Sequence, residues 1–346
     1  MQAMNRPDAV PVMELGGDAY ARGFAHGHAL RERIGRMIDV YGGYFARPEA
    51  AVFTVARHFQ RVIADFRGEY AEEIEAVAEG AGVDPLWIFA LNARSEFLSS
   101  MPLAECTALH YRGTPFLGQN WDWEKSLENL IVLARVTRPD GHRFLMMTEP
   151  GIIGKIGLNS AGLGVCFNFL PIAKPTNGVP VHILLRAVLD SGSLAQARAV
   201  IDRAGNGRSA NVLVADRDGQ RFDFEFAGDE CFELPDDEEV LAHTNHYLGR
   251  DMVVMRELYE NSSIRLARAA DLSRAGKERS TDAMQSVLSD RADPANSICQ
   301  SYQRRFLLGV IGTVCSIVFD LEAGVMHFRK GNAPDAPFRR YRVSEG

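Results

Sequence analysis

The sequence predicts an α+β fold in which helices and antiparallel sheets form layers. Apolar residues recur at three- and four-residue spacing through most of the first hundred residues, which indicates helices. After about residue 105, short β-like runs bounded by turn residues follow one another as hairpins, and helices later return in series. Because hairpins and helices are each grouped, an antiparallel layered fold is favoured over a doubly wound parallel sheet.

The N-terminal hundred residues are predicted to form three helices. Helical spacing runs over residues 18–38 and again over 54–82, with Arg and Glu interleaved. Asp84 is suited to cap a third helix, because Pro85 at the first helical position has no N–H that needs a partner. The apolar residues that follow extend this helix to about Phe97.

The rest of the chain is predicted to contain groups of hairpins and groups of helices. β-branched and aromatic runs between turn residues indicate strands, and renewed three- and four-residue spacing indicates helices. The predicted strands are 108–111, 116–121, 130–137, 144–148, 162–169 and 240–244, with hairpins over 211–226 and between 313–319 and 325–328. The predicted helices are 181–189, 194–204, 251–275 and 281–289.

Composition limits the classes of function. The chain has 346 residues, 46% apolar and 24% charged, which is typical of soluble globular proteins. At roughly 150 residues per domain, this length suits two domains or one large layered fold. The net charge of −7 argues against nucleic acid or an anionic membrane as the main partner. With no long apolar run and no leader pattern, we expect a cytoplasmic protein.

The sequence predicts neither a metal nor a cofactor. The familiar glycine-rich nucleotide motifs, the serine-hydrolase motif and the zinc-protease motif are absent. His26 and His28 are two residues apart in a predicted helix and therefore do not share a face. His243 and His246 flank a strand end but have no third ligand at a recognisable spacing. We expect packing roles for all four histidines.

One of the five cysteines has an unusual setting. Free cysteines are most often small buried hydrophobes. This description fits four of them, which are Cys166, Cys231, Cys299 and Cys315. Cys106 instead stands at the switch from helix to strand, one hairpin before a run in which polar groups lie between large aromatic residues. The pattern alone leaves a catalytic and a structural cysteine equally open. The switch itself could be a domain junction, a loop or a processing site.

Four motifs along the chain carry a family resemblance. They are Cys106-Thr107, Gly118–Trp123 (GQNWDW), Asn159–Gly164 (NSAGLG) and His243–His246 (HTNH). In this order they resemble the autoproteolytic acyltransferase and hydrolase family typified by fungal isopenicillin N acyltransferase, which belongs to the N-terminal-nucleophile hydrolases. Residues 16–23 and 313–317 also fit, so the resemblance extends along nearly the whole chain.

The resemblance implies an αββα sandwich of two antiparallel sheets that is made as an inactive precursor. A cut between Glu105 and Cys106 would leave a helical segment, residues 1–105, and a core, residues 106–346, that begins with the nucleophile. A thiol at a new N-terminus carries its own base, because an α-amino group has a pKa of about 7.7 to 8.0 and is partly neutral at cellular pH.

The resemblance also implies roles for polar residues. Asp122 would orient the amine of Cys106, and Asn245 would donate a hydrogen bond to the oxyanion. Their alternative interpretations are a turn aspartate and a strand-end asparagine. Arg265 is a candidate cation that would lower the pKa of the thiol, and a solvated helix charge is an equal alternative.

The implied activity is cleavage of a linear acyl amide through a thioester on Cys106, with transfer of the acyl group to water or to an amine. The expected partners are a small acyl amide and, for acyl transfer, a coenzyme A thioester donor; a homo-oligomer stays open. Four aromatic residues are expected to line the substrate pocket, namely Tyr20, Phe24, Trp123 and Phe167.

Two departures from the family pattern keep other functions open. Glu105 precedes the expected cut where that acyltransferase has glycine, and Gln300 stands where relatives often have arginine. The arginine could be supplied by Arg304, Arg305 or Arg265. One alternative function is a non-catalytic, uncut binding module. Another is a conventional cysteine hydrolase with His246 as its base.

Overall fold

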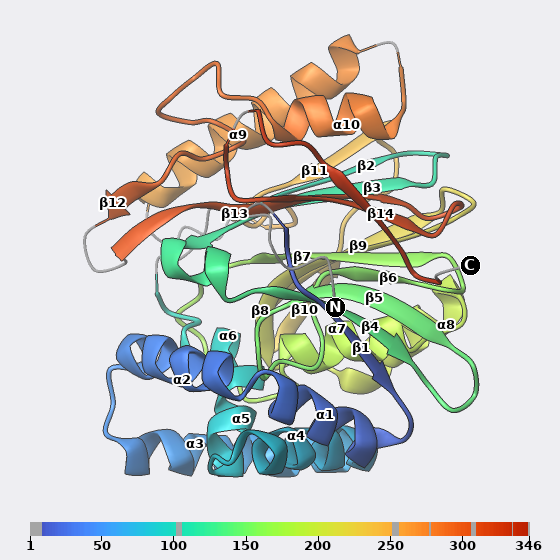
Figure 1. Ribbon diagram of the computed structural model, residues 1–346. Helices are drawn as coiled ribbons and strands as arrows, with labels where there is room; N and C mark the ends of the chain where they lie inside the picture. Colours follow the sequence, from blue (N-terminus) through green and yellow to red (C-terminus); the bar gives the residue numbers. More distant parts are fainter. Residues whose placement is uncertain are drawn as a thin grey trace.

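Two β-sheets lie face to face, and helices cover the outer face of each (Figure 1). This computed structural model describes residues 9–101, 106–250, 256–276, 278–305, 309–333 and 335–344. Glu105, on one side of the predicted cut, lies outside these ranges. The predicted four-layer αββα architecture is confirmed.

The larger sheet has eight strands within the described ranges, in the order β1-β4-β5-β6-β7-β8-β9-β10. Their bounds are β1 Val12–Gly16, β4 Val132–Thr137, β5 Arg143–Thr148, β6 Gly157–Asn159, β7 Leu163–Phe169, β8 Arg208–Asp216, β9 Arg221–Gly228 and β10 Glu230–Glu233. Neighbours are antiparallel with one exception, because β1 runs parallel to β4 with Val12 beside Leu133. The expectation of purely antiparallel sheets is therefore wrong at this edge.

The second sheet is antiparallel and carries β3 and β13 at its centre. Its order is β11-β2-β3-β13-β14-β15, and β12 also pairs with β13. The bounds are β2 Thr107–Tyr111, β3 Phe116–Glu124, β11 Val240–His243, β12 Gln303–Arg305, β13 Gly309–Asp320, β14 Val325–Lys330 and β15 Arg339–Arg342. A short 3₁₀ helix, Lys125–Asn129, follows β3.

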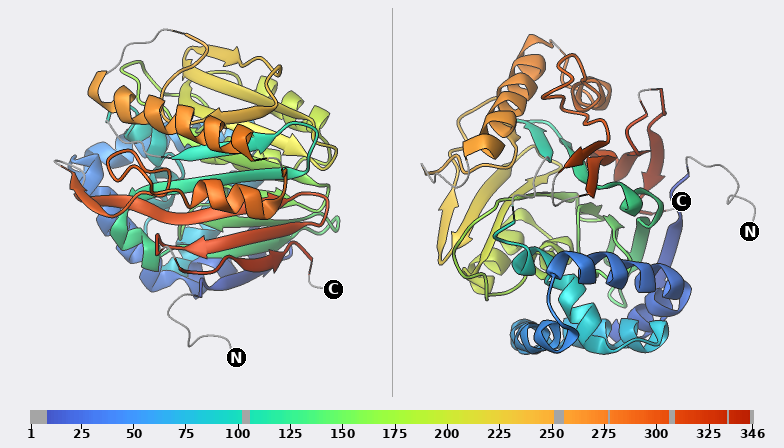
Figure 2. Two further views of the ribbon diagram at one scale, coloured as in Figure 1. Left: turned by 90° about the horizontal axis from the view of Figure 1, so that it is seen from above. Right: turned by 90° about the vertical axis from the view of Figure 1, so that its left-hand side faces the viewer.

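Most helices lie on the side of the larger sheet, and two cover the second sheet (Figures 1 and 2). The first group is α1 Ala19–Ala29, α2 Arg31–Phe45, α3 Glu49–Phe66, α4 Gly68–Ala81, α5 Pro85–Asn92, α6 Arg94–Phe97, α7 Val181–Leu189 and α8 Leu194–Ala204. The second group is α9 Arg256–Ala275 and α10 Thr281–Leu288. As predicted, Asp84 caps α5 by accepting a hydrogen bond from the backbone N–H of Leu86.

The predicted N-terminal helices are each divided in the structure. The helix expected over 18–38 is α1 and α2, which meet at Leu30, and the helix expected over 54–82 is α3 and α4, which meet at Arg67. Close packing between α1 and α4 requires small residues, because a Cβ at Gly27 would lie 2.0 Å from the carbonyl oxygen of Val77. Helical spacing continues across the breaks, so the periodicity did not show them.

Several short strands were also not predicted. These are β1, β6, β10, β12 and β15, each of three to five residues. Such strands carry too few residues for an alternating pattern to stand out. The helix predicted from residue 251 is described from Arg256, since residues 251–255 lie outside the described ranges.

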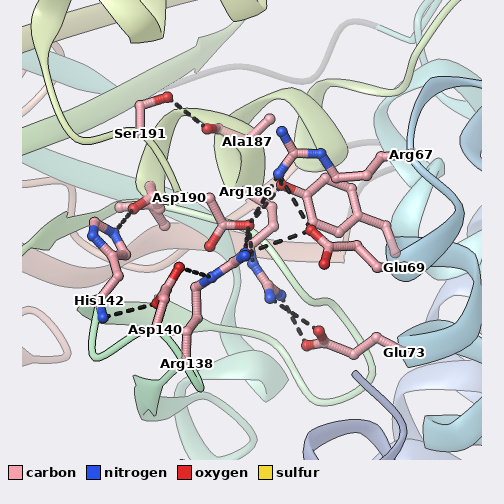
Figure 3. A network of polar contacts seen from close by, with 12 residues as sticks. Arg67, Glu69, Glu73, Arg138, Asp140, His142, Arg186, Ala187, Asp190 and Ser191 are labelled. Carbon is pink, nitrogen blue, oxygen red and sulfur yellow. Dashed lines mark hydrogen bonds and ion pairs between the residues drawn. The ribbon is translucent and has the colours of Figure 1, made fainter. Parts of the chain in front are cut away.

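A buried network of ions joins the N-terminal helices to the rest of the fold (Figure 3). Arg186 of α7 donates to both carboxylate oxygens of Glu73 of α4, at 2.8 and 2.9 Å. Arg186 also pairs with Asp190 at 3.2 Å, and Arg138 reaches the same carboxylate at 2.9 Å. Removing one partner of such a buried pair typically costs about 3–5 kcal/mol. The helical segment is thus held to the core by β1 and by charge pairing.

Candidate active site

Cys106 lies directly before β2, in the space between the sheets, and is 4% exposed. Strand β2 pairs with β3 so that Thr107 is opposite Asn120, and β3 continues beyond this point to Glu124. The Cys106 thiol accordingly meets the far part of β3, with Sγ 3.9 Å from the backbone oxygen of Asp122. The structure brings the two predicted site residues Cys106 and Asp122 together.

A β-bulge lies on the other side of Asp122. Strand β13 pairs Thr313 with Asp122 and Cys315 with Trp121, so one residue of β13 is left over between them. Bulges twist a strand locally and change the direction of its side chains, and they are frequent beside active sites. Strand β13 therefore departs from regular sheet geometry opposite Trp121 and Asp122, next to the nucleophile candidate.

Arg265 of α9 joins Cys106 to Asn245. Its Nη1 donates to the backbone oxygen of Cys106 at 2.7 Å and to Oγ1 of Thr107 at 2.9 Å. Its Nη2 donates to Oδ1 of Asn245 at 3.1 Å, and Nε donates to Oδ1 of Asn261 at 2.8 Å. The side chain is fully buried, so Arg265 is not a solvated helix charge.

Arg265, Arg304 and Arg305 were the candidates to supply the arginine that relatives often have where this chain has Gln300. Among them, Arg265 donates a hydrogen bond to the backbone of Cys106. Arg304 and Arg305 lie on β12. Gln300 itself exchanges hydrogen bonds with Thr313, since its N–H donates to the Thr313 hydroxyl at 2.8 Å and its carbonyl accepts from the Thr313 N–H at 3.1 Å. Both bonds use backbone atoms of Gln300, so they fix the chain beside the bulge whichever side chain stands at this position.

Asn245 follows β11 and is held in a fixed orientation. Because Oδ1 accepts from Arg265, the amide nitrogen must lie on the opposite side, where Nδ2 donates to the backbone oxygen of Phe169 at 2.9 Å. The backbone N–H of Asn245 donates to Oγ of Ser262 at 2.8 Å. The amide donor of Asn245 thus faces the strand end that carries Phe169, beside the Cys106 cavity.

The cavity beside Cys106 is small in this uncut chain. It offers about 20 Å³ to the centres of water molecules, which is room for a single water and not for an acyl group. The residues that line it are Arg94, Ser95, Leu98, Cys106, Trp121, Asp122, Trp123, Phe167 and Phe169. Two of the predicted pocket aromatics, Trp123 and Phe167, are among them. Tyr20 and Phe24 are exposed on α1 and do not line it.

The Cys106 thiol is protonated at neutral pH in this environment. Burial, reinforced by the negative charge of Asp122, raises the pKa of Cys106 to about 12. The hydrogen bond to the Asp122 backbone and the charges of Arg265 and Lys155 act in the opposite direction but are outweighed. As predicted, the charge of Arg265 lowers the pKa of Cys106, but burial raises this pKa by more. Such a thiol needs a base before it can attack.

A second group of buried ions adjoins this cavity, and sequence reasoning missed it. Glu149 accepts from Arg94 at 2.7 Å, from the hydroxyl of Tyr41 and from Lys155. The Lys155 ammonium lies 3.4 Å from the centroid of the Trp121 ring. Burial lowers the pKa of Lys155 to about 7, against the opposing charge of Glu149. One signal was present, since Lys155 is the only charged residue in the stretch GIIGKIGLN.

His243 is also more than a packing residue. Its Nδ1 lies 2.9 Å from the backbone oxygen of Thr244 and its Nε2 lies 2.7 Å from Oε1 of Glu225. Both partners are acceptors, so both ring nitrogens must carry hydrogen and the ring is an imidazolium. Burial would lower the pKa of His243, but the hydrogen bond to Glu225 and the charges of Asp223 and Glu225 raise it.

The carboxylate of Glu225 fixes the segment that presents Asn245. Besides His243, it accepts from the backbone N–H groups of Leu248 at 2.7 Å and Gly249 at 2.9 Å. Glu225 comes from β9 of the larger sheet, whereas His243 ends β11 of the second sheet. A signal for this site was present in β9, where Asp223 and Glu225 alternate with phenylalanines on a buried strand.

Replacing His243 by glutamine should make the unfolding free energy depend differently on pH. The folded-state pKa of His243 is raised above the unfolded value of about 6.5. The contribution of His243 to the free energy of unfolding is therefore complete below about pH 6.5, and it is lost as the pH rises through the folded-state pKa of His243. We expect H243Q to be less stable than the unmutated protein by about 2–3 kcal/mol at pH 6, with a smaller difference at pH 9.

Urea denaturation at several pH values measures this difference. His28, which is exposed on α1, provides the control, because H28Q replaces a surface histidine and should change the free energy of unfolding little. A stability difference for H243Q that stays constant from pH 6 to pH 9 would contradict a buried imidazolium.

Comparisons with known proteins assign the chain to a family. The chain belongs to the acyl-coenzyme A:6-aminopenicillanic acid acyl-transferase family, whose sequence model matches residues 110–335. It is 30% identical to the 40 kDa form of the acyl-coenzyme A:6-aminopenicillanic-acid-acyltransferase of Emericella nidulans. The similarity extends over 333 residues, which is 91% of this chain and 92% of that protein. The predicted class, an enzyme that transfers or hydrolyses acyl groups, is confirmed by this membership.

Two solved structures are also similar. A mutant form of the conjugated bile acid hydrolase from Clostridium perfringens gives a TM-score of 0.47 at 14% identity, over 70% of this chain and 98% of that one. The penicillin V acylase from Agrobacterium tumefaciens gives a TM-score of 0.44 at 13% identity, over 67% of this chain and 84% of that one.

Among the helices described, none is long and apolar enough to span a membrane. No group of three or more His, Cys, Asp or Glu side chains in the described ranges is arranged to hold a metal ion.

Proposed function

We propose that this protein is an N-terminal-nucleophile enzyme that cuts itself before Cys106 and then cleaves a small linear acyl amide through a thioester. The observation that carries the proposal is the Arg265 side chain, which hydrogen bonds both the backbone of Cys106 and the amide of Asn245. A buried guanidinium thereby links the proposed nucleophile, which lines the small cavity, to the proposed oxyanion donor. Family membership supports acyl chemistry at this site.

In the uncut chain, the sulfur of Cys106 attacks the carbonyl carbon of Glu105. The peptide C–N bond breaks, an acyl–sulfur bond forms, and the nitrogen of Cys106 takes up a proton as it becomes an amine. Water then hydrolyses the thioester and releases the carboxylate of Glu105. The products are a helical chain, residues 1–105, and a chain of residues 106–346, which the ion network around Arg186 and the pairing of β1 with β4 hold together.

In the mature form the new amine of Cys106 serves as the base. It takes the thiol proton, the sulfur attacks the substrate carbonyl, and the amine returns the proton to the departing nitrogen. Asp122 orients this amine, and the Nδ2 group of Asn245 donates to the oxyanion. An amide carries two donor hydrogens, and the backbone oxygen of Phe169 takes only one of them.

A histidine base is less well supported. Burial, together with the positive charge of His243, lowers the pKa of His246 to about 4. A base with so low a pKa is weak at neutral pH. His246 Nδ1 also lies 2.8 Å from Oγ of Ser262, which binds the backbone of Asn245, so its contacts support the strand-end segment.

Hydrolysis and acyl transfer are separated by one assay. The processed protein is incubated with an N-acyl amine, with and without an acyl thioester donor, and the products are measured by mass spectrometry. We expect free acid and free amine in equal amounts with no donor present, which is hydrolysis. A new amide that appears only with the donor would show that acyl transfer is the main activity.

A further inference from the structure

Trp123 forms part of the wall of the Cys106 cavity, and α2 holds it there. The indole Nε1 of Trp123 donates to the hydroxyl of Tyr41 at 3.0 Å, and the ring of Tyr44 lies 5.6 Å from the Trp123 ring, centroid to centroid. An indole N–H can only donate, and leaving it buried without an acceptor is costly. Because Trp123 is buried, the hydroxyl of Tyr41 fixes the direction in which the indole points.

Glu149 fixes the hydroxyl of Tyr41 in turn. Tyr41 is fully buried, and its hydroxyl donates to Oε1 of Glu149. The other carboxylate oxygen, Oε2, accepts from Arg94 at 2.7 Å and from Lys155, so both oxygens of the carboxylate are held. A hydroxyl that donates its hydrogen to a carboxylate keeps its lone pairs for the N–H of Trp123. The acceptor for the indole is therefore in place before any substrate arrives.

The second tryptophan of the cavity depends on the same carboxylate. The Lys155 ammonium lies 3.4 Å from the centroid of the Trp121 ring and also donates to Glu149. A cation over the face of an indole attracts the ring, most strongly in a desolvated place. Both indoles beside Cys106 are thus linked to Glu149, and the cavity that they help to line has room for a single water molecule. An acyl group can enter only when part of this wall moves.

Tyr41 and Trp123 lie on opposite sides of the proposed cut. Tyr41 belongs to α2 of the helical segment, and Trp123 lies on β3 of the core. We propose that Tyr41 is a positioning residue that holds Trp123 against the Cys106 cavity and thereby limits the length of the acyl group that the enzyme accepts. This inference rests on the proposed function, because there the acyl group bonds to Sγ of Cys106 and so lies beside this wall. The helical segment then sets the selectivity of a nucleophile that it does not carry.

Acyl amides of different length test the inference with the processed protein, both chains present. Acetyl, hexanoyl and decanoyl 4-nitroanilide share one amine and release 4-nitroaniline, which is measured by its absorbance. Replacing Tyr41 by phenylalanine keeps the ring and removes the acceptor of the Trp123 N–H. We expect Y41F to raise the ratio of kcat/KM for the decanoyl amide over the acetyl amide about 10-fold, because a loosened indole makes room for a longer chain.

The amine side of the substrate is varied separately. Hexanoyl amides of aniline and of 2-naphthylamine share one acyl group and differ in the size of the amine. Their ratio of kcat/KM should be the same in Y41F as in the unmutated protein, because the proposed wall faces the acyl group.

Tyr70 provides the matched control for Tyr41. It is also a fully buried tyrosine, and its hydroxyl donates to the carboxylate of Asp190 at 2.7 Å. Arg186 lies over the Tyr70 ring and Arg94 over the Tyr41 ring, both at 5.2 Å from the centroid. Neither Tyr70 nor Asp190 lines the cavity beside the nucleophile. Y70F should therefore lose stability without a change in the preference for acyl length.

A double-mutant cycle shows whether Tyr41 acts through Trp123. W123F removes the indole N–H and makes the same wall smaller, so it should also raise the ratio of decanoyl to acetyl cleavage. If Tyr41 acts through this N–H, adding Y41F to W123F should change the ratio by less than about two-fold, because the contact that Y41F removes is already absent.

Fluorescence measures the hold on Trp123 without any substrate. The chain has three tryptophans, and the third, Trp87, lies on α5 outside the cavity. In a W87F background, emission comes from Trp121 and Trp123 alone. Acrylamide should quench this emission more strongly after Y41F is added, and Y70F should leave the quenching unchanged.

Several outcomes contradict the role of Tyr41. They are an unchanged length ratio in Y41F, an equal shift by Y41F in the W123F background, and quenching that Y41F does not alter. A change confined to the two hexanoyl amides would put this wall beside the amine and refute a limit on acyl length. If the unmutated protein cleaves none of the amides, the proposed function fails and the limit fails with it, whereas cleavage without a change of length ratio in Y41F refutes the role of Tyr41 alone.

Discussion

Replacing Cys106 by alanine should leave a single chain of 346 residues that cleaves no amide. The unmutated protein should separate into residues 1–105 and 106–346 under denaturing conditions, because in the proposed mechanism the sulfur of Cys106 breaks the bond that precedes it. Alanine has no nucleophile, so the precursor bond persists and the amine that would serve as base never forms. Intact mass measurement after denaturation distinguishes one chain from two.

Cys166 provides the control for loss of a buried cysteine. It is fully buried on β7 within the apolar run LGVCFNF, and its environment fits the predicted role of a small hydrophobe. C166A should still yield two chains and an active enzyme, with a modest loss of stability. A single intact chain from the unmutated gene would instead support the alternative of an uncut binding module. Glu105 and Gln300, which depart from the family pattern, are the residues that suggest this alternative. Two chains from C106A would exclude self-cleavage by this sulfur.

The layers of the fold could be predicted because they depend on local patterns. Grouped hairpins and grouped helices indicated sheets covered by helices, and β13 and β14 appear where the last hairpin was expected. Strand β1 could not be predicted in this way. It is five residues long, and its parallel pairing with β4 joins positions about 120 residues apart, which no local pattern encodes. The break at Arg67, where the backbone is extended between α3 and α4, likewise leaves no mark in the spacing of apolar residues.

The candidate site likewise divides into residues that the sequence identified and contacts that it could not show. Cys106, Asp122 and Asn245 lie in motifs, so resemblance identified them, and the structure places all three around one cavity or one guanidinium. The pairs of Arg94 with Glu149 and of Glu225 with His243 join different layers of the fold. A single sequence contains no record of such long-range pairs. A buried charge in an apolar stretch is the only trace that they leave.

His26 illustrates a structural role that was predicted correctly. It was expected to pack rather than to bind metal, and its Nε2 accepts a hydrogen bond from the backbone N–H of Gly151 at 3.0 Å. Burial, with the charge of Arg186 adding to it, lowers its pKa to about 4, so the ring is neutral and can accept this bond. His26 thereby ties α1 to the loop that precedes Lys155.

Replacing Asn245 by alanine should lower kcat by about 100- to 1000-fold, as removal of one oxyanion donor does in other acyl-transfer enzymes. Arg265 and the backbone of Phe169 fix the orientation of the Asn245 amide, and Phe169 lines the Cys106 cavity, so the proposed donor would be in place before charge develops on the substrate oxygen. Its stabilisation acts on the transition state, and KM should therefore change little. Steady-state kinetics on the processed enzyme gives both parameters.

Asn159 supplies a matched control for this substitution. It is an equally buried asparagine whose Nδ2 donates to the backbone oxygens of Leu189 and Ser191, at 3.0 and 2.8 Å, away from Cys106. N159A should lower stability but leave kcat of the folded enzyme within a few fold. N245D removes the donor with almost no change in shape, and it should lose as much kcat as N245A. An N245A enzyme with normal kcat would show that the oxyanion is stabilised elsewhere, and the link through Arg265 would then be purely structural.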